Sequence, residues 1–343
     1  MLHKLAKRIL KTPLQADIIY LTGKANDMRT ITINKNDANQ RMDKFLSKRF
    51  RTMPKSLMYK YIRTKYIKLN GKKCSIDDIL REGDVLTLYI KDEFFEARYD
   101  EYEFMKAPKT LSVIYEDENL LILDKPEGVL AHPDKTYHFD SMVARVQHYL
   151  YDKGEYDPKK ENSFSPAMAN RLDRNTGGLI IAAKNAVALK ELNRLIKERL
   201  IKKLYLCICE GKPKKPSGLL KGTLTKNESK NIVKVSKKSD EGKEIATQYR
   251  VIDSSGKYSL IEIDLLTGRT HQIRAHMASI GCPLAGDTKY GGHPLRVKGH
   301  TGQALYSYCL RFSEIVDSPL SYLSGKEFKA NKIWFEKDGK VNL

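Results

Sequence analysis

The chain has 343 residues, more than the roughly 100 to 200 of a single domain, so its length favours two domains. With 41% hydrophobic and 30% charged residues it has ample apolar material for a core, which excludes wholesale disorder. No apolar stretch approaches the roughly 20 residues of a membrane span, so we expect a soluble protein with no membrane partner. The net charge of +20 favours a polyanionic partner, nucleic acid ahead of an anionic membrane surface.

The five cysteines form no CxxC pair and lack the spacing of metal ligands. Neither a disulfide scaffold nor a structural zinc site is expected, and a reducing cytoplasm fits this pattern. The residues are Cys74, Cys207, Cys209, Cys282 and Cys309.

Residues 1–39 form an N-terminal extension. Because chain termini are usually poorly ordered, we expect residues 1–27 to be a mobile tail or to precede a start at Met28. A targeting helix is the alternative, because Leu2, Leu5 and Ile9 fall on one helical face.

Residues 40–91 form a compact basic module, with 14 Lys and Arg against 5 Asp and Glu. Apolar residues at helical spacing predict a helix that begins near Met42, and Pro54 in a first turn opens a second helix. Asn70-Gly71 accepts positive φ and predicts a two-residue hairpin turn. A last strand is expected over residues 85–90.

Three segments of this module resemble an S4-type RNA-binding domain over its whole length: RMDKFLSKRF, PKSLMYKYIRTKYIKLNGKK and LREGDVLTLYI. The resemblance implies that the helical pair and the hairpin present basic side chains to structured RNA. Phosphate contacts of this kind supply affinity and register but not sequence choice. A solvated surface role is the alternative for each of the candidates, which are Lys55, Lys60, Arg63, Lys65, Lys72 and Lys73.

Residues 92–104 carry six acids against one arginine, and we expect an acidic linker there. Residues 105–343 then form the larger domain, with 40 basic and 28 acidic residues. A hairpin is predicted around residues 116–119, one helix capped by Asp140 and another capped by Asn185. Strands mixed with scattered helices indicate an α+β fold rather than a regular βαβ series. Further strands are expected at 204–210, 231–235, 246–253, 258–266 and 304–312.

Asp173 lies between Arg171 and Arg174, in a glycine-rich entry to the apolar strand LIIAA. A nearby guanidinium lowers the pKa of an aspartate by about 1 to 3 units, so an ionised carboxylate could act here as nucleophile or base. A structural ion pair is the alternative, and residue types alone favour it.

The segment LLTGRTHQIRAHM follows an apolar strand and is expected to turn into a short helix that ends near Gly281. Arg269, His271 and Arg274 then gather around the start of that helix. Helix N-termini attract anions, so a phosphate or a carboxylate can bind there. Basic residues on a solvated helix face are the alternative.

Four segments resemble the RluA-type pseudouridine synthases, in the same order and over nearly all of the larger domain. They are VIYEDENLLILDKPEGVLAHP, NRLDRNTGGLIIAAKN, KKLYLCICEG and LLTGRTHQIRAHMASIGCPLAGDTKYGG. The S4-like part resembles that of the RluC-like branch. The resemblance implies an α+β protein in which a small S4-type RNA-binding domain precedes a larger mixed-sheet catalytic domain.

By this resemblance Asp173 is the catalytic aspartate, Tyr205 the active-site tyrosine that packs against the target ring, and Arg274 the basic partner of the aspartate. Arg171 takes the space of the flipped base, and we expect Arg269 and His271 to bind substrate. The sequence departs from the family pattern at Asn170, where His is usual, and at Gly177-Gly178, where Ser-Gly is usual. These departures concern the surroundings of the site and substrate preference.

The implied activity is cofactor-free isomerisation of specific uridines, in large-subunit (23S) ribosomal RNA, by base flipping and an aspartate-dependent route. No metal or small-molecule cofactor is expected, and we expect a monomer. A transfer-RNA-directed synthase and a catalytically silent RNA-binding or ribosome-assembly factor are the alternatives. The joint presence of Asp173, Tyr205 and Arg274 disfavours the silent factor. The residues leave open whether the aspartate attacks covalently or forms a glycal intermediate.

Overall fold

The computed structural model describes residues 28–96, 102–134, 139–227, 232–236, 242–300 and 302–343. The expectations for residues 1–27 therefore lie outside the described residues. The chain divides into two compact units. The first, here the N-terminal unit, contains the described residues up to 96 together with residues 161–164. The second, here the large unit, contains the described residues from 102 to 160 and from 165 to 343.

The N-terminal unit packs two helices against a four-stranded sheet of order β1-β4-β2-β3. Both helices form because apolar side chains recur on one face, and Phe45, Leu46 and Met58 are buried there. Asp37 is buried as well, and its carboxylate accepts hydrogen bonds from Asn162 and Ser163. The elements are β1 (Arg29–Thr32), α2 (Met42–Arg49), α3 (Lys55–Arg63), β2 (Ile67–Leu69), β3 (Lys72–Lys73), β4 (Val85–Leu88) and a 3₁₀ turn (Asp92–Phe94).

The hairpin predicted at Asn70-Gly71 is confirmed between β2 and β3. Asn70 and Gly71 have φ of 50° and 73°, and the Asn70 side-chain oxygen accepts from the Val85 amide at 2.8 Å. The strand expected over residues 85–90 is confirmed as β4, which ends at Leu88. One local prediction was wrong, because Pro54 is the N-cap of α3 rather than part of its first turn.

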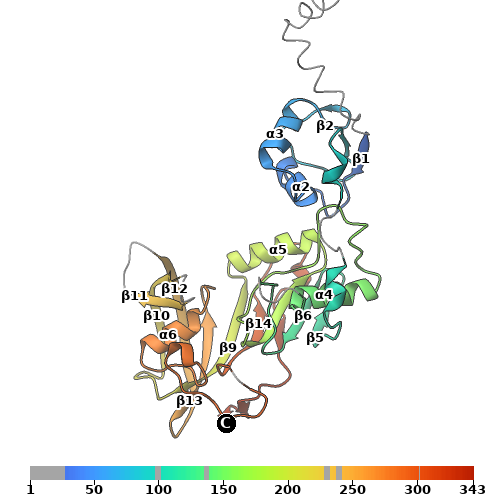
Figure 1. Cartoon of the computed structure of the whole chain (residues 1–343). Helices are drawn as coiled ribbons and strands as arrows, with labels where there is room; N and C mark the ends of the chain where they lie inside the picture. The colour runs from blue at the N-terminus through green and yellow to red at the C-terminus, as the bar shows by residue number, and fades with distance from the viewer. Residues whose placement is uncertain (1–27, 97–101, 135–138, 228–231, 237–241, 301) are drawn as a thin grey trace, which may run out of the picture. The chain divides into compact units, whose positions relative to one another are not determined.

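The large unit is built on a mixed sheet whose main path is β11-β10-β12-β13-β9-β14-β8-β6-β5, with β15 paired to β14 and β7 to β8. Among the strand pairs of this sheet that the structure describes, β14 and β8 run parallel and the others are antiparallel. Figure 1 shows β10–β12 with α6 at one end of this sheet and β5, β6 and α4 at the other. A large mixed sheet with scattered helices agrees with the expected α+β class.

The strands of the large unit are β5 (Val113–Glu116), β6 (Leu120–Lys125), β7 (Ala167–Met168), β8 (Gly177–Ala183), β9 (Ile201–Glu210), β10 (Ser217–Asn227), β11 (Ile232–Ser236), β12 (Lys243–Ser255), β13 (Tyr258–Leu265), β14 (Leu305–Phe312), β15 (Glu327–Lys329), β16 (Glu336–Lys337) and β17 (Lys340–Val341). Its helices are α4 (Met142–Asp152), α5 (Ala186–Lys197) and α6 (Gln272–Ser279), with 3₁₀ turns at Glu103–Lys106, Thr288–Tyr290 and Ser321–Leu323.

The interior strand β8 is buried along all of its residues because both faces of the sheet are covered there. Alternate side chains of a strand face opposite sides. Ile180 packs in a cluster with residues of α4 and α6, whereas Ile181 packs in a second cluster with residues of α5. The strand that the Asp173 segment enters is therefore fixed between two apolar layers.

The predicted cap of α5 is confirmed, but that of α4 was wrong. Asn185 accepts from the Ala188 amide at 2.8 Å. At α4 the cap is Ser141, and the neighbouring Asp140 instead pairs with Arg145 through two hydrogen bonds of 2.6 and 2.8 Å. A strong arginine partner thus removes the aspartate from the competition for the helix end.

The remaining strand predictions are confirmed within a few residues at each end, but β10 was not predicted. Its sequence holds two glycines and several exposed side chains, which weaken the signal of a strand. Among the residues that the structure describes, no helix combines the length and apolar character needed to cross a membrane.

Candidate active site

The loop that carries Asp173 is fastened by Lys125, the last residue of β6. Lys125 is completely buried. Its ammonium donates to three carbonyl oxygens, at 2.9 Å for Pro126, 2.8 Å for Val129 and 3.0 Å for Arg174. Burial lowers the pKa of Lys125 to about 8. The three carbonyl oxygens replace the water that the buried charge has lost, so the loops after β6 and before β8 are tied to one point.

Arg174 also joins these two loops directly. The Gly128 amide donates to the Arg174 carbonyl at 2.9 Å, and the Arg174 Nε donates to the Gly128 carbonyl at 3.0 Å. The Asp173 carbonyl accepts from the Thr176 amide at 3.0 Å, which closes the turn into β8. Arg174 therefore orders the backbone beside Asp173.

The cation that hydrogen-bonds to the Asp173 carboxylate is Arg274, in the first turn of α6. Its Nη1 lies 3.2 Å from Asp173 Oδ2. The same guanidinium donates to both oxygens of Asp287, at 2.7 and 2.8 Å. Burial opposes ionisation, but the hydrogen bonds and charge of Asp287 and the charge of Asp173 raise the pKa of Arg274. Asp287 thus holds the guanidinium in place for Asp173.

The two members of this pair differ in exposure. The Asp173 side chain is 26% exposed, whereas that of Arg274 is 9% exposed. A carboxylate that faces solvent and rests on a buried cation can act as a nucleophile or a base on an incoming ligand. The geometry brings these two predicted residues together from segments far apart in sequence.

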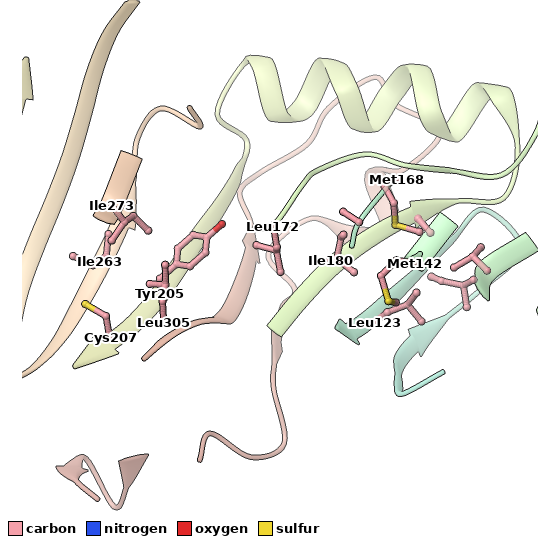
Figure 2. Close-up of a cluster of buried hydrophobic side chains, with 14 of the residues drawn as sticks. Leu123, Met142, Met168, Leu172, Ile180, Tyr205, Cys207, Ile263, Ile273 and Leu305 are labelled. Carbon is pink, nitrogen blue, oxygen red and sulfur yellow. The ribbon is translucent and has the colours of Figure 1, made fainter. Parts of the chain in front are cut away.

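Tyr205 lies in the same apolar cluster as Leu172, which precedes Asp173, and Ile273, which precedes Arg274. Figure 2 shows the Tyr205 ring between Ile273 and Leu172. The ring is 4% exposed, and burial raises the pKa of the hydroxyl, with a further contribution from the charge of Asp173. Tyr205 is therefore protonated at neutral pH and lies in electrostatic range of the carboxylate.

His271 is the residue immediately before α6 and has a left-handed backbone, with φ of 54°. Its Nε2 lies 3.8 Å from Asp173 Oδ2, and its Nδ1 lies 3.0 Å from the hydroxyl of Tyr290. Burial lowers the pKa of His271, and the charge of Arg274 adds to that effect while Asp173 opposes it. His271 therefore belongs to the same group of side chains as Asp173 and Arg274.

Arg269 and Arg171 have exposed positions in the two segments that flank this group. The Arg269 amide donates to the side chain of Gln272 at 3.1 Å, which closes the turn into α6. The Arg171 side chain is exposed and that of the next residue, Leu172, is buried, so successive side chains before Asp173 face solvent and core in turn. Both guanidinium groups can therefore reach a ligand at the surface.

The two departures from the family pattern have local structural reasons. The Asn170 side-chain oxygen accepts from the Ile181 amide at 2.8 Å, so this residue ties the Asp173 segment to β8. A side chain at Gly177 would run into the ring of Tyr306, whose hydroxyl donates to Asp124 at 2.6 Å. Gly177 therefore makes room for the Tyr306 ring.

The six basic candidates of the N-terminal unit are all exposed, and none forms an ion pair with another residue that the structure describes. Their ammonium and guanidinium groups can therefore take up anions. They lie on α3, after its end and on β3, and they are Lys55, Lys60, Arg63, Lys65, Lys72 and Lys73.

Sequence reasoning missed three residues that support the site: Lys125, Asp287 and Tyr290. Each is an ordinary residue type in a segment with no signal of its own, although all three fall within the segments that carried the family resemblance. A lysine directly after an apolar strand was the one available hint for Lys125, because a buried lysine requires several acceptors.

Comparisons with known proteins show which family the chain resembles. Residues 119–279 match the family described as RNA pseudouridylate synthase. An uncharacterized RNA pseudouridine synthase of Mycoplasma capricolum is 32% identical over 90% of this chain and 100% of its own length. The ribosomal large subunit pseudouridine synthase C of Vibrio cholerae is 30% identical over 81% of this chain and 86% of its own.

The solved structure of human RNA pseudouridylate synthase domain containing 1 has the same fold, with a TM-score of 0.51 and 20% identity over 66% of this chain and 85% of that chain. The chain therefore belongs to the RNA pseudouridylate synthase family. It is an RNA pseudouridine synthase, an isomerase whose substrate is RNA.

Proposed function

We propose that this enzyme isomerises specific uridines of large-subunit (23S) ribosomal RNA, with Asp173 as its catalytic carboxylate. The observation that carries the assignment of Asp173 is its 3.2 Å contact with the buried Arg274, combined with an exposure of 26%. The Vibrio cholerae relative, by its name, acts on the large ribosomal subunit. The S4-like segment, which resembles the RluC-like branch, supports the same choice of target.

The reaction breaks the bond from N1 of the uracil to C1′ and forms a bond from C5 to C1′. The proton that C5 loses equals the proton that N1 gains, so the isomerisation balances without an oxidant or a cofactor. Asp173 starts it in the ionised state, either by covalent attack or by removal of the C2′ proton. Tyr205 packs against the target ring.

A uridine within structured RNA must leave its stack before Asp173 can reach it, at a cost of a few kcal/mol. We propose that Arg171 fills the space that the base vacates and that Arg269 and His271 bind the flipped nucleotide. The exposed positions of both arginines support these roles. Looped or bulged uridines are the expected targets because they are cheaper to extrude.

We further propose that residues 40–91 are an S4-type RNA-binding domain and that residues 105–343 are the catalytic domain. The support is the set of six exposed basic side chains on α3, directly after its end and on β3. Such contacts offset the cost of base flipping by adding sequence-independent affinity.

Mapping of pseudouridines in the ribosomal and transfer RNA of cells with and without the gene tests the proposed target. We expect the loss of one or more sites in the large-subunit RNA, restored by the wild-type gene. Loss of sites in transfer RNA alone establishes the transfer RNA alternative. An unchanged pattern in both RNA classes establishes that the protein acts on neither.

A further inference from the structure

The hydroxyl of Tyr290 connects β11 to the side chains around Asp173. The Val233 amide lies 3.0 Å from this hydroxyl oxygen, and His271 Nδ1 lies 3.0 Å from it on another side. A backbone amide can only donate, so the oxygen accepts from Val233. Burial raises the pKa of Tyr290, and the hydroxyl keeps its own proton at neutral pH. That proton is available for His271 Nδ1.

Burial lowers the pKa of His271, and the charges of Arg274 and Lys289 lower it further. The charges of Asp173 and Asp287 oppose this effect without reversing it, so the imidazole is neutral at neutral pH. A neutral imidazole carries one proton, on either Nδ1 or Nε2. If Nδ1 accepts from a hydroxyl, the proton is on Nε2. His271 Nε2 is the atom that lies 3.8 Å from Asp173 Oδ2.

We propose that Tyr290 is a positioning residue that fixes His271 in the tautomer with its proton on Nε2, so that His271 presents an N–H to the Asp173 carboxylate. This inference rests on the proposed role of Asp173. The separation of 3.8 Å is longer than a hydrogen bond of roughly 2.7 to 3.2 Å, so the N–H acts through its dipole until RNA binding closes the gap.

One short segment supports both groups that face Asp173. Asp287 holds Arg274 by two hydrogen bonds, and Tyr290, three residues later, contacts His271 and lies under the Arg274 guanidinium at 5.1 Å. The rings of His271 and Tyr290 meet edge to face, at 5.7 Å and 81°. The turn Thr288–Tyr290 therefore aligns a charged and a neutral donor on one carboxylate.

Tyr290→Phe in the full chain tests the proposal, because phenylalanine keeps the ring under Arg274 and removes only the hydroxyl. Nitrogen NMR of histidine-labelled protein reads the tautomer, and the signal of His271 among the 8 histidines is assigned from its loss in His271→Gln. We expect a neutral Nε2–H imidazole in the wild type and a mixture of tautomers in Tyr290→Phe. Protonation on Nδ1 in the wild type, or an unchanged tautomer in the variant, overturns the proposal.

Activity provides the second readout, as tritium release from ribosomal RNA labelled at C5 of uridine. We expect Tyr290→Phe to lower kcat by about 3- to 10-fold, the worth of one hydrogen bond, with KM unchanged. Tyr249→Phe is the matched control, since its hydroxyl bonds to the Lys215 carbonyl in the same unit, and it should change neither readout. A rise in KM with kcat unchanged in Tyr290→Phe contradicts a positioning role.

Two substitutions at His271 separate this role from a structural one. The amide nitrogen of glutamine can reach the place of Nε2, whereas that of asparagine corresponds to Nδ1. The backbone φ of 54° favours asparagine over glutamine, so a purely structural role predicts the more active enzyme for His271→Asn. The proposal predicts the reverse order. Because the tautomer is measured without RNA, inactivity of the wild type on ribosomal RNA would refute the proposed target and leave the tautomer result standing.

Discussion

Replacement of Asp287 by asparagine tests how the site holds its cation. The carboxylate of Asp287 is 1% exposed, the Arg274 side chain is 9% exposed, and two hydrogen bonds of 2.7 and 2.8 Å join them. Asparagine keeps the shape but removes the charge and turns an amide donor toward a guanidinium donor. Loss of one partner from a buried pair costs about 3 to 5 kcal/mol. We expect a value near the lower end, because Arg274 retains its contact with Asp173.

The single tryptophan, Trp334, reports on the unit concerned. It belongs to the large unit, where its indole N–H donates to Glu127 at 2.6 Å. Tryptophan fluorescence during urea titration therefore follows unfolding of that unit. Asp287→Asn should lower its free energy of unfolding by about 3 kcal/mol.

The matched control is Glu327→Gln. Glu327 pairs with Arg311 at 2.6 Å, but the side chains are 28% and 50% exposed, so the loss should stay below about 1 kcal/mol. Equal effects of the two variants, or less than about 1 kcal/mol for Asp287→Asn, would refute the view that Asp287 compensates a buried guanidinium.

Three further predictions concern other parts of the chain. Burial lowers the pKa of His276 to about 4, so below pH 6.5 the unfolded state binds a proton that the folded state does not bind. The free energy of unfolding from urea titrations should therefore fall by about 3 kcal/mol between pH 6.5 and 4, and His276→Gln should abolish that part of the pH dependence. Lys55, Lys60 and Arg63 replaced together by glutamine should weaken RNA binding and flatten its dependence on salt by roughly 2 to 3 contacts, and an unchanged slope in filter binding contradicts their role. Gly178 has φ of 111° and lies against a carbonyl of β14, so Gly178→Ala should destabilise the large unit in the Trp334 assay, and unchanged stability contradicts that strain.

Local signals in the sequence predicted those parts of the fold that depend on neighbouring residues. Asn185 caps its helix and Asn70-Gly71 forms its turn because both act within a few residues along the chain. The prediction at Asp140 was wrong because Arg145, one turn away, offers a stronger partner than the helix end. The strand β10 was not predicted because its glycines weaken the local signal of a strand, and pairing with β12 stabilises it in the fold.

Contacts between distant segments explain what the sequence left open at the site. Asp173 and Arg274 were predicted through the family resemblance, and the structure adds their separation and exposure. Arg174, beside Asp173 in sequence, donates to Gly128 instead. Asp287 and Lys125 also reach partners far along the chain, Asp287 contacting Arg274 and Lys125 contacting the Arg174 carbonyl. Both residues are buried, and burial is a property of the folded chain.

Tritium release by Asp173→Asn shows whether the Asp173 carboxylate carries the isomerisation. Asparagine has nearly the same shape, so binding of ribosomal RNA labelled at C5 of uridine should change by no more than a few-fold in a filter assay. Asp140→Asn, which removes a carboxylate from the surface of the same unit, is the control and should remain active. We predict no release above background for Asp173→Asn at normal RNA binding. Release at the wild-type rate would show that the carboxylate at this position does not carry the reaction.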